Sequence, residues 1–444
     1  MSLTGTFLRS CTCRFLAAKP AAGLGLPHAI DGQQRRTIVT KNMLVLPDDH
    51  AAREPWPYQE KGYSWFHAIY DRTQKRFNTN SKLITVEGNI GCEKSSFAKE
   101  LADRLGFYYI PEFKMEKLLI DRYGQDLRDF YHLFPKRFRF FDDEMFYKDP
   151  MSDMTAVMRD FIFKCRFDEL LNAVAHILNT GQGVVLENCI YSDLVYANAM
   201  RAKNYIGPEY FKRYYYIRKR ALPQLFFWPH LVIYLDTPVS VCLENVRKEG
   251  NVNKANTIDE TYLQTIAESY KDVLTEAKRQ SKILVYDWSK PGDVDTVIED
   301  IEAIDFDFFE WHSGDVFETW HTPQDEMAWT ERRIKVTNKY AARVITFDNI
   351  PVHEAGELYI NPRDAAQFIN VMITQVLKSR YGYGYNKERG DPPKGFWAFR
   401  TGHTRPEPWY DYYLREAWLD NAYSHETLLY PDGETYDPDY LHSH

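Results

Sequence analysis

A loop bounded by glycine and ending in lysine and serine is the feature of this chain whose residue types and spacing are best suited to chemistry. A short apolar segment leads into Gly88, and Lys94 and Ser95 follow at the spacing of the phosphate-binding pattern Gly-x-x-x-x-Gly-Lys-Ser/Thr. In such loops, successive backbone N–H groups surround phosphate oxygens at the N-terminus of a helix. The lysine contacts the outer phosphates, and the hydroxyl binds Mg²⁺. The pattern predicts a nucleotide site formed by Gly88, Asn89, Ile90, Gly91, Lys94, Ser95 and Ser96.

Glu93 departs from this pattern, because it stands where the second glycine belongs. Its side chain brings a negative charge close to the expected phosphate. A single like charge costs about 1–4 kcal/mol at effective dielectric constants from about 80 down to about 20, which is roughly one to three decades of affinity. We therefore expect weak binding of ATP, ADP or a deoxynucleotide. Ser95 would then bind Mg²⁺ only together with that nucleotide.

The elements that must position this loop alternate between short apolar segments and helical patterns. Five apolar segments predict strands, at 83–86, 107–110, 184–186, 231–235 and 283–286. Helical patterns fall at 95–105, 153–179, about 190–217, 238–249 and 259–280. Short, continuously apolar strands separated by helices are typical of a parallel sheet covered on both faces. The sequence therefore predicts an α/β fold with a doubly wound, parallel, five-stranded sheet.

Two acidic residues follow predicted strands at the edge where such sheets bind ligands. Glu112 comes after the second strand, and Glu187 comes at the end of the third. Glu112 also fits a solvated loop residue, so a chemical role for it depends on the fold. Asp193 fits the N-cap of a helix, because aspartate favours that position.

These residues together resemble the deoxynucleoside kinases. The shared features are the run from Val86 to Gly91, followed by Lys94 and Ser95, and the acids Glu112 and Glu187. The resemblance implies a P-loop kinase-type fold in which Lys94 binds phosphates, Ser95 binds Mg²⁺ and Glu112 is the base for a sugar hydroxyl. In phosphoryl transfer the protein mainly positions groups and neutralises charge, which such a set of residues can do.

The chain also departs from the kinase pattern beyond Glu93. The family reads Glu-Arg-Ser where this chain reads Glu187-Asn188-Cys189, and asparagine cannot replace a fixed cation. The family's arginine-rich lid is here a segment with Arg247, Lys248 and Lys254. Loss of one well-placed arginine costs roughly 10³- to 10⁵-fold in rate. We therefore expect no catalytic residue, with Glu112 and Glu187 as vestigial base candidates.

A narrower resemblance is to the accessory subunits of mitochondrial complex I that are homologous to these kinases. It is carried by residues 180–187, 191–193 and 230–236, and by patches that extend to residue 391. The resemblance implies a place on the matrix side of the inner membrane, with subunits of the membrane arm as partners. FAD binding has been credited to such subunits, but the chain has no Gly-x-Gly-x-x-Gly motif, so the sequence gives FAD little support.

Changes in composition along the chain predict four regions. Residues 1–40 are basic and almost free of acids, as in a mitochondrial transit peptide. Residues 41–80 form an extended lead-in, and residues 81–305 form the kinase-like domain. Residues 306–444 are rich in tryptophan, tyrosine and proline, and we expect an extended interaction arm with one helix, at about 365–377. Tyr383 and Tyr385 are candidate partner contacts in this aromatic C-terminal extension.

The overall composition restricts the remaining functions. The net charge of −8 argues against non-specific binding of nucleic acid. No apolar run approaches the roughly 20 residues of a membrane helix, so a membrane would be reached through a protein partner. The six cysteines form no disulfide framework. Cys11 and Cys13 fall in the predicted transit peptide, and we expect the four later ones, which are scattered singly, to be buried. His312 and His321 have no zinc-ligand spacing, so we expect no metal there.

Three functions remain open on the sequence alone. The first is a non-catalytic accessory subunit of complex I that keeps a kinase fold. The second is an active mitochondrial deoxynucleoside kinase with an unusual loop, and the third is a nucleotide-sensing regulator that binds without turnover. Glu93, Asn188 and the long aromatic extension favour the first.

Overall fold

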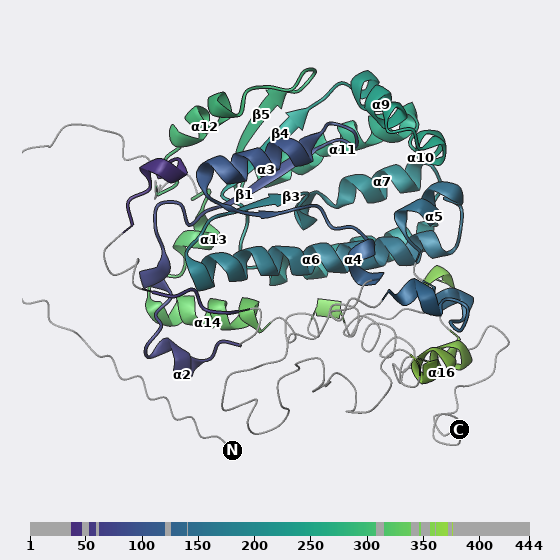
Figure 1. The fold of residues 1–444 in the computed structure, drawn as a ribbon, viewed down its shortest axis with the longest axis horizontal. Helices are drawn as coiled ribbons and strands as arrows, with labels where there is room; N and C mark the ends of the chain where they lie inside the picture. Colours follow the sequence, from purple (N-terminus) through teal and green to yellow (C-terminus); the bar gives the residue numbers. More distant parts are fainter. Residues whose placement is uncertain are drawn as a thin grey trace, which may run out of the picture. The chain divides into compact units, whose positions relative to one another are not determined.

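The computed structural model describes residues 37–46, 53–58, 62–119, 126–139, 141–307, 315–338, 346–347, 356–359, 361–371 and 375. Within these residues, five parallel strands form one sheet in the order β2-β3-β1-β4-β5 (Figure 1). Their bounds are β1 Leu83–Gly88, β2 Tyr108–Ile110, β3 Val184–Glu187, β4 Leu231–Asp236 and β5 Lys282–Asp287. The predicted α/β fold with a parallel five-stranded sheet is confirmed.

The helices that cover and flank the sheet include short 3₁₀ segments. The α-helices are α2 Trp65–Ala68, α3 Lys94–Leu105, α4 Glu116–Leu119, α5 Asp143–Lys148, α6 Met154–Thr180, α7 Leu194–Ala202, α8 Pro208–Ala221, α9 Val239–Lys248, α10 Val252–Thr257, α11 Glu260–Ala277, α12 Val294–Glu302, α13 Glu318–His321, α14 Glu326–Thr337 and α16 Pro362–Val371. The 3₁₀ segments are η1 Lys41–Met43, η2 Gln74–Arg76, η3 Leu127–Phe130, η4 Lys136–Phe138, η5 Ile190–Ser192, η6 Leu222–Gln224 and η7 Gly356–Leu358.

β1 lies at the centre of the sheet and is completely buried, because β3 and β4 pair with its two edges. Ile84 and Val86 belong to the core under α3 and α12, whereas Leu83 belongs to the core shared with α6, α7 and α11. Figure 1 shows α3 and α12 on one side of the sheet, and α6 and α7 on the other. Side chains alternate between these layers along each strand. Because β1, β2 and β3 pair in parallel, their carboxyl ends meet at one edge of the sheet.

One predicted helix is wrong in its extent. The sequence pattern suggested a continuous helix over about 190–217, but the structure has η5, α7 and then α8. Gly207 has extended backbone and Pro208 takes the first position of α8. A proline has no N–H to donate to a preceding turn, so it starts a helix more readily than it continues one.

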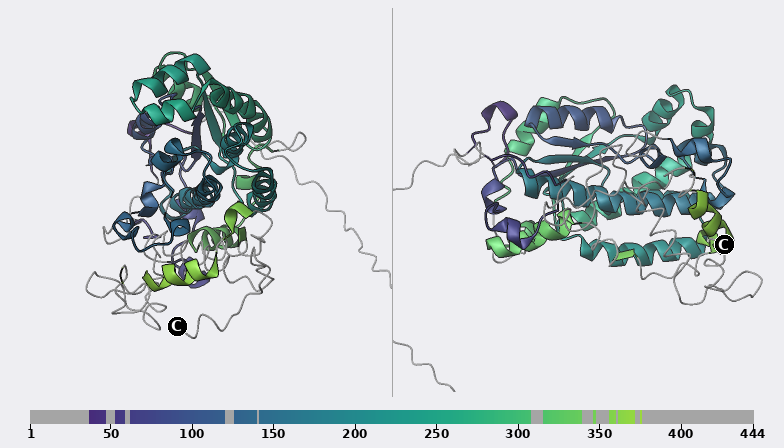
Figure 2. Two further views of the ribbon diagram at one scale, coloured as in Figure 1. Left: turned by 90° about the vertical axis from the view of Figure 1, so that its right-hand side faces the viewer. Right: turned by 60° about the horizontal axis from the view of Figure 1, so that its bottom comes forward.

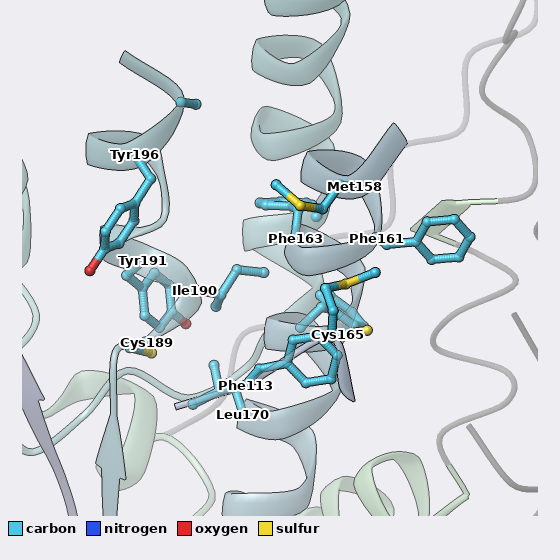
Figure 3. Close-up of a cluster of buried hydrophobic side chains, with 14 of the residues drawn as sticks. Phe113, Met158, Phe161, Phe163, Cys165, Leu170, Cys189, Ile190, Tyr191 and Tyr196 are labelled. Carbon is cyan, nitrogen blue, oxygen red and sulfur yellow. The ribbon is translucent and has the colours of Figure 1, made fainter. Parts of the chain in front are cut away.

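α6 is the longest helix, and all but three of its 27 residues are buried. Figure 3 shows Met158, Phe161, Phe163, Cys165 and Leu170 projecting from it into the apolar core. The side of α6 that faces the sheet and α7 is buried in the main apolar core. Helix α14 also packs against α6. Phe347 adds an edge-on ring contact to Phe167, with centroids 5.1 Å apart. The chain itself therefore covers α6 around its circumference.

The expectation of a single helix after residue 305 is wrong. Within the described residues, α13 and α14 precede α16, which spans Pro362–Val371 and so begins three residues before the predicted start at about 365. α14 begins at Asp325, whose carboxylate accepts the N–H of Ala328. Its buried face mixes Trp329 and Arg333, so no apolar stripe shows in the sequence. Residues 376–444, with Tyr383 and Tyr385, lie outside the described residues, as do residues 1–36 and His312.

The lead-in before β1 has little regular structure apart from η1, α2 and η2. Cys92, Cys165, Cys189 and Cys242 are buried free thiols, which confirms the expectation for these cysteines. Among the described helices, none combines the length and the apolar character needed to cross a membrane.

Candidate functional site

The loop between β1 and α3 has the backbone of a phosphate-binding turn, and both of its glycines are required by close contacts. A Cβ on Gly88 would lie 2.7 Å from the Sγ of Cys92. Gly91 has a φ of 81°, and a Cβ there would lie 2.7 Å from the carbonyl oxygen of Cys242. A side chain at either position would therefore clash, and at Gly91 it would also be strained.

Two asparagine side chains hold this loop in place. Asn89 donates its side-chain amide to the carbonyl of Leu263 in α11, at 3.0 Å. Asn245 of α9 donates to the carbonyl of Gly91, at 2.8 Å. The backbone N–H of Ile90 donates a hydrogen bond to the side-chain oxygen of Asn89, at 2.8 Å. The loop is thus supported by α9 and α11 in the shape that a phosphate would need.

Glu93 occupies the left-handed region, with φ 58° and ψ 29°, at the N-cap of α3. That conformation suits glycine and costs another residue roughly 1–2 kcal/mol. Glu93 is exposed, and it lines the mouth of the cavity described below. Ser96 donates its hydroxyl to the carbonyl of Glu93 at 2.9 Å. The loop therefore keeps the backbone turn of a phosphate-binding loop although Glu93 replaces glycine. The Glu93 carboxylate lies at the entrance to the cavity.

Lys94 is buried and points to Glu112, with Nζ 3.6 Å from Oε2. Arg166 of α6 contacts the other oxygen of the same carboxylate at 2.7 Å. Burial alone would raise the pKa of Glu112, but Lys94 and Arg166 lower it below its ordinary value. Burial would likewise lower the pKa of Lys94, and Glu112 raises it well above its usual range. Both groups are therefore charged at neutral pH.

Ser95 and Glu187 form the second contact at this edge of the sheet. The hydroxyl of Ser95 donates to Glu187 at 2.7 Å, and Tyr109 donates to the other carboxylate oxygen at 2.8 Å. The backbone N–H of Glu112 lies 3.4 Å from that oxygen. A hydroxyl beside a carboxylate offers the oxygen ligands that Mg²⁺ prefers, so Ser95 and Glu187 fit a nucleotide-bound Mg²⁺. No group of three or more metal-ligand side chains occurs among the described residues.

Asp193 stands at the N-cap position of α7, as expected, but its side chain makes no capping hydrogen bond there. It is fully buried and forms ion pairs with Arg159 and Arg166, the latter at 2.9 Å. Tyr214 donates its hydroxyl to the second oxygen at 2.6 Å. The two arginines lie on α6, so only the tertiary fold brings them to Asp193. The signal available in the sequence was the presence of charged residues, among them these two arginines, within a largely apolar helical segment.

A cavity of about 750 Å³ joins these groups, a volume typical of small-molecule sites. Its wall is formed by the loop, by residues 112–116, by α5, α6 and α7, and by the α9–α10 segment. Among the described residues, six basic and five acidic side chains line it: Lys94, Lys114, Arg159, Arg166, Lys248 and Lys254, with Glu93, Glu112, Glu116, Asp143 and Glu249. The cavity therefore has almost no excess of positive charge.

Two of the three cations of the predicted lid reach this cavity, but both are already paired. Lys248 binds Glu244 at 2.9 Å, and Lys254 forms an ion pair with Glu249. Asn188, where the kinases have arginine, is buried with a φ of 54° and brings no charge. Among the predicted site residues, the structure thus brings together Gly91, Ile90, Lys94, Ser95 and Glu112 around one cavity. Glu187 reaches the site through Ser95.

Glu87 is a buried acid that the sequence analysis did not identify. It accepts hydrogen bonds from the N–H of Cys189 at 2.8 Å and the hydroxyl of Ser192 at 2.7 Å. Tyr270 donates to it at 3.2 Å. Burial raises the pKa of Glu87 to about 7, although the hydrogen bond from Ser192 opposes the shift. The carboxyl group is therefore half protonated near neutral pH.

Comparison with known proteins assigns this fold and cavity to a family. The profile of the deoxynucleoside kinases matches residues 84–323. The chain belongs to the deoxynucleoside kinase family. Within this family it is 31% identical over 327 residues to the mouse (Mus musculus) NADH dehydrogenase (ubiquinone) 1 alpha subcomplex subunit 10, mitochondrial. That alignment covers 72% of this chain and 85% of the relative.

One other relative and one solved structure carry kinase names. The deoxyguanosine kinase of Dictyostelium discoideum is 29% identical over 235 residues, which cover 53% of this chain and 73% of that protein. The solved structure of a deoxyadenosine kinase from M. mycoides with bound dATP is 19% identical, with a TM-score of 0.37, and covers 49% of this chain and 96% of that one.

Proposed function

We propose that this member of the deoxynucleoside kinase family is a non-catalytic accessory subunit of the mitochondrial NADH dehydrogenase, complex I. It would lie on the matrix side of the inner membrane, contact subunits of the membrane arm and support their assembly and stability. The observation that carries the proposal is the similarity to subunit 10 over 327 residues. That length exceeds the matched kinase core, residues 84–323, and so includes flanking segments.

The chemistry of the site supports a loss of catalysis. A base for a sugar hydroxyl must accept a proton, but Glu112 is held ionised by Lys94 and Arg166, which lowers its pKa. A group with a lowered pKa is a weaker base. Phosphoryl transfer also needs cations free to neutralise the transferred group, and Lys94 is engaged by Glu112. Asn188 supplies no replacement.

A weakly bound nucleotide remains compatible with this role. The loop keeps its turn, and the N-terminus of α3 can still attract an anion. Lys94 and the backbone of residues 88–91 would hold phosphates, and Ser95 with Glu187 would hold Mg²⁺. The site gives no support to FAD. Glu93 at the mouth weakens the binding of any anionic ligand.

An active deoxynucleoside kinase is the second candidate. A nucleotide-sensing regulator, which would bind nucleotide at the same site without turnover, is a further alternative. The support for the kinase is that Lys94, Ser95 and Glu112 lie together at one cavity, and that one relative is named a deoxyguanosine kinase. A soluble kinase and an assembled subunit differ in native size, which gives a direct test.

The test follows the full-length protein in mitochondria on native gels. We expect it to migrate with complex I, and we expect deletion of residues 380–444 to disturb assembly more than Lys94→Ala does. Lys94 lies inside the cavity, where it pairs with Glu112 and would meet a bound phosphate, whereas the extension is aromatic, as interface cores are. Migration as a monomer or dimer would refute the proposal. Loss of assembly with Lys94→Ala alone, in a variant whose thermal stability matches that of the wild type, would instead show that nucleotide occupancy is required structurally.

A further inference from the structure

A group of large apolar side chains lies exposed on α2, directly after its C-terminal end and at the start of α14. Its members are Trp65, Phe66, Ile69, Tyr70 and Met327, between 52% and 74% exposed; we call it the α2 surface. Figures 1 and 2 show α2 beside α14, and the two helices are in contact. Single exposed apolar residues are ordinary, but a cluster marks an interaction site.

The α2 surface is held rigidly from below by a buried ion-pair network. Arg333 of α14 is completely buried and binds Asp71 at 2.7 Å, and Arg76 binds the other oxygen of Asp71 at 2.8 Å. The guanidinium of Arg333 also lies over the ring of Tyr63, 3.7 Å from its centroid. Asn179 of α6 accepts from Arg333 at 2.7 Å. Rigidity before binding lowers the entropic cost of association.

The network joins two segments that lie outside the kinase core. Residues 63–76 precede residue 84 and residues 325–338 follow residue 323, so neither belongs to the part that matches the kinases. The cavity is lined by neither segment. The α2 surface is therefore an addition to the kinase fold that serves something other than nucleotide binding.

The charges next to the α2 surface indicate the chemistry of its partner. Arg72 and Lys75 follow it directly, are exposed, and form no ion pair within the described part of the chain. Glu326 at the start of α14 accepts hydrogen bonds from the backbone N–H groups of Thr73 and Gln74 through its two carboxylate oxygens. Tryptophan, tyrosine, phenylalanine, methionine and arginine are the residues enriched in protein interfaces.

We propose that the α2 surface is a docking site for another protein subunit, whose matching face is apolar with carboxylates at its edge opposite Arg72 and Lys75. The proposal rests on the proposed function, since it names a contact of the accessory subunit. A lipid surface fits less well. Helices that lie in a membrane interface are usually long and amphipathic, whereas α2 has four residues and is fixed by buried ion pairs.

The test places the photoreactive amino acid benzoylphenylalanine at position 66 of the full-length protein in cells that lack their own copy. The control carries the same residue in place of Val252, which is 71% exposed on α10. After illumination, intact mitochondria are run on native gels, and adducts are sequenced by mass spectrometry. Two further samples carry the photoreactive residue at position 66 together with a second change. One has Ile69→Ser, and the other has both Arg72→Glu and Lys75→Glu.

We expect position 66 to form one adduct, always with the same peptide of another subunit, and that peptide to contain apolar and acidic residues. We expect no adduct at position 252. Ile69→Ser should reduce the yield of the adduct at position 66 by roughly 30-fold, as for an interface hot spot, and the charge reversal should also reduce it. An adduct only with lipid, only with a second copy, or no more than at position 252 overturns the proposal. Migration with complex I but without a protein adduct refutes the docking site alone. A specific protein adduct in a small species supports the docking site and refutes the complex I assignment.

Discussion

Lys94 and Glu112, which the sequence analysis assigned to phosphate binding and to the base, form an ion pair with each other, with 3.6 Å between Nζ and Oε2. Each group satisfies the charge of the other, Lys94 being buried and Glu112 half-buried, and Arg166 reinforces the pair. A phosphate that entered would have to compete with Glu112 for Lys94. The kinase elements are thus retained in an arrangement that is complete without substrate.

Removal of the charge at Glu93 should strengthen nucleotide binding. Glu93→Gly also suits the left-handed backbone, with φ 58°. We expect ATP with Mg²⁺ to bind roughly tenfold tighter or more, because one like charge costs about 1–4 kcal/mol. Calorimetry checks this, with Glu100→Gln, an exposed acid further along α3, as the matched control. Equal affinity for Glu93→Gly and wild type would show that solvent already screens the carboxylate.

Phosphorylation of deoxynucleosides by the purified protein should be negligible. Kinases of this chemistry turn over at roughly 1–100 s⁻¹, and we expect a rate far below that range. Glu93→Gly combined with Asn188→Arg should restore some nucleotide affinity without ordinary turnover, because the lid cations Lys248 and Lys254 stay paired with acids. A wild-type rate within the kinase range, lost on Glu112→Gln, would favour the kinase.

The buried carboxylate of Asp193 should be essential for stability. Asp193→Asn removes the counter-charge of Arg159 and Arg166, and a broken buried ion pair costs about 3–5 kcal/mol. Urea unfolding measures the loss. Asp295→Asn is the control, because its pair with Arg104 is exposed and should contribute under about 1 kcal/mol. Similar losses for the two variants would contradict the role given to the buried cluster.

Glu87 should make stability fall as the pH rises. Its pKa is raised in the folded state from 4.5 to about 7, so the folded chain holds a proton that the unfolded chain has released. The contribution is fully present below the unfolded pKa and is lost as pH rises through the folded one. The shift corresponds to about 3 kcal/mol. Unfolding experiments from about pH 4 to about pH 8 should show a smaller decline for Glu87→Gln, and an unchanged decline would exclude Glu87 as its source.

The sheet and the loop were predictable because local patterns encode them. Short apolar segments marked all five strands, and the spacing of Gly88, Lys94 and Ser95 marked the turn. The clusters around Asp193 and Glu87 were not predictable. Their partners come from distant elements, as when Arg166 meets Asp193 across 27 residues, so a local reading suggested only a helix cap. α14 was missed because its buried face includes Arg333, whose partner lies 262 positions earlier.

That separation of 262 positions between Asp71 and Arg333 also sets an order of events during synthesis. The lead-in emerges before the sheet, yet its buried acid has only Arg76 as a partner until α14 has been made. Contacts between distant positions carry the largest loop-closure cost and form late. Tyr63 and the rings of α2 therefore stay without their support until the chain has passed residue 333. A nascent chain released before that point exposes an aromatic N-terminal segment that chaperones and proteases can recognise.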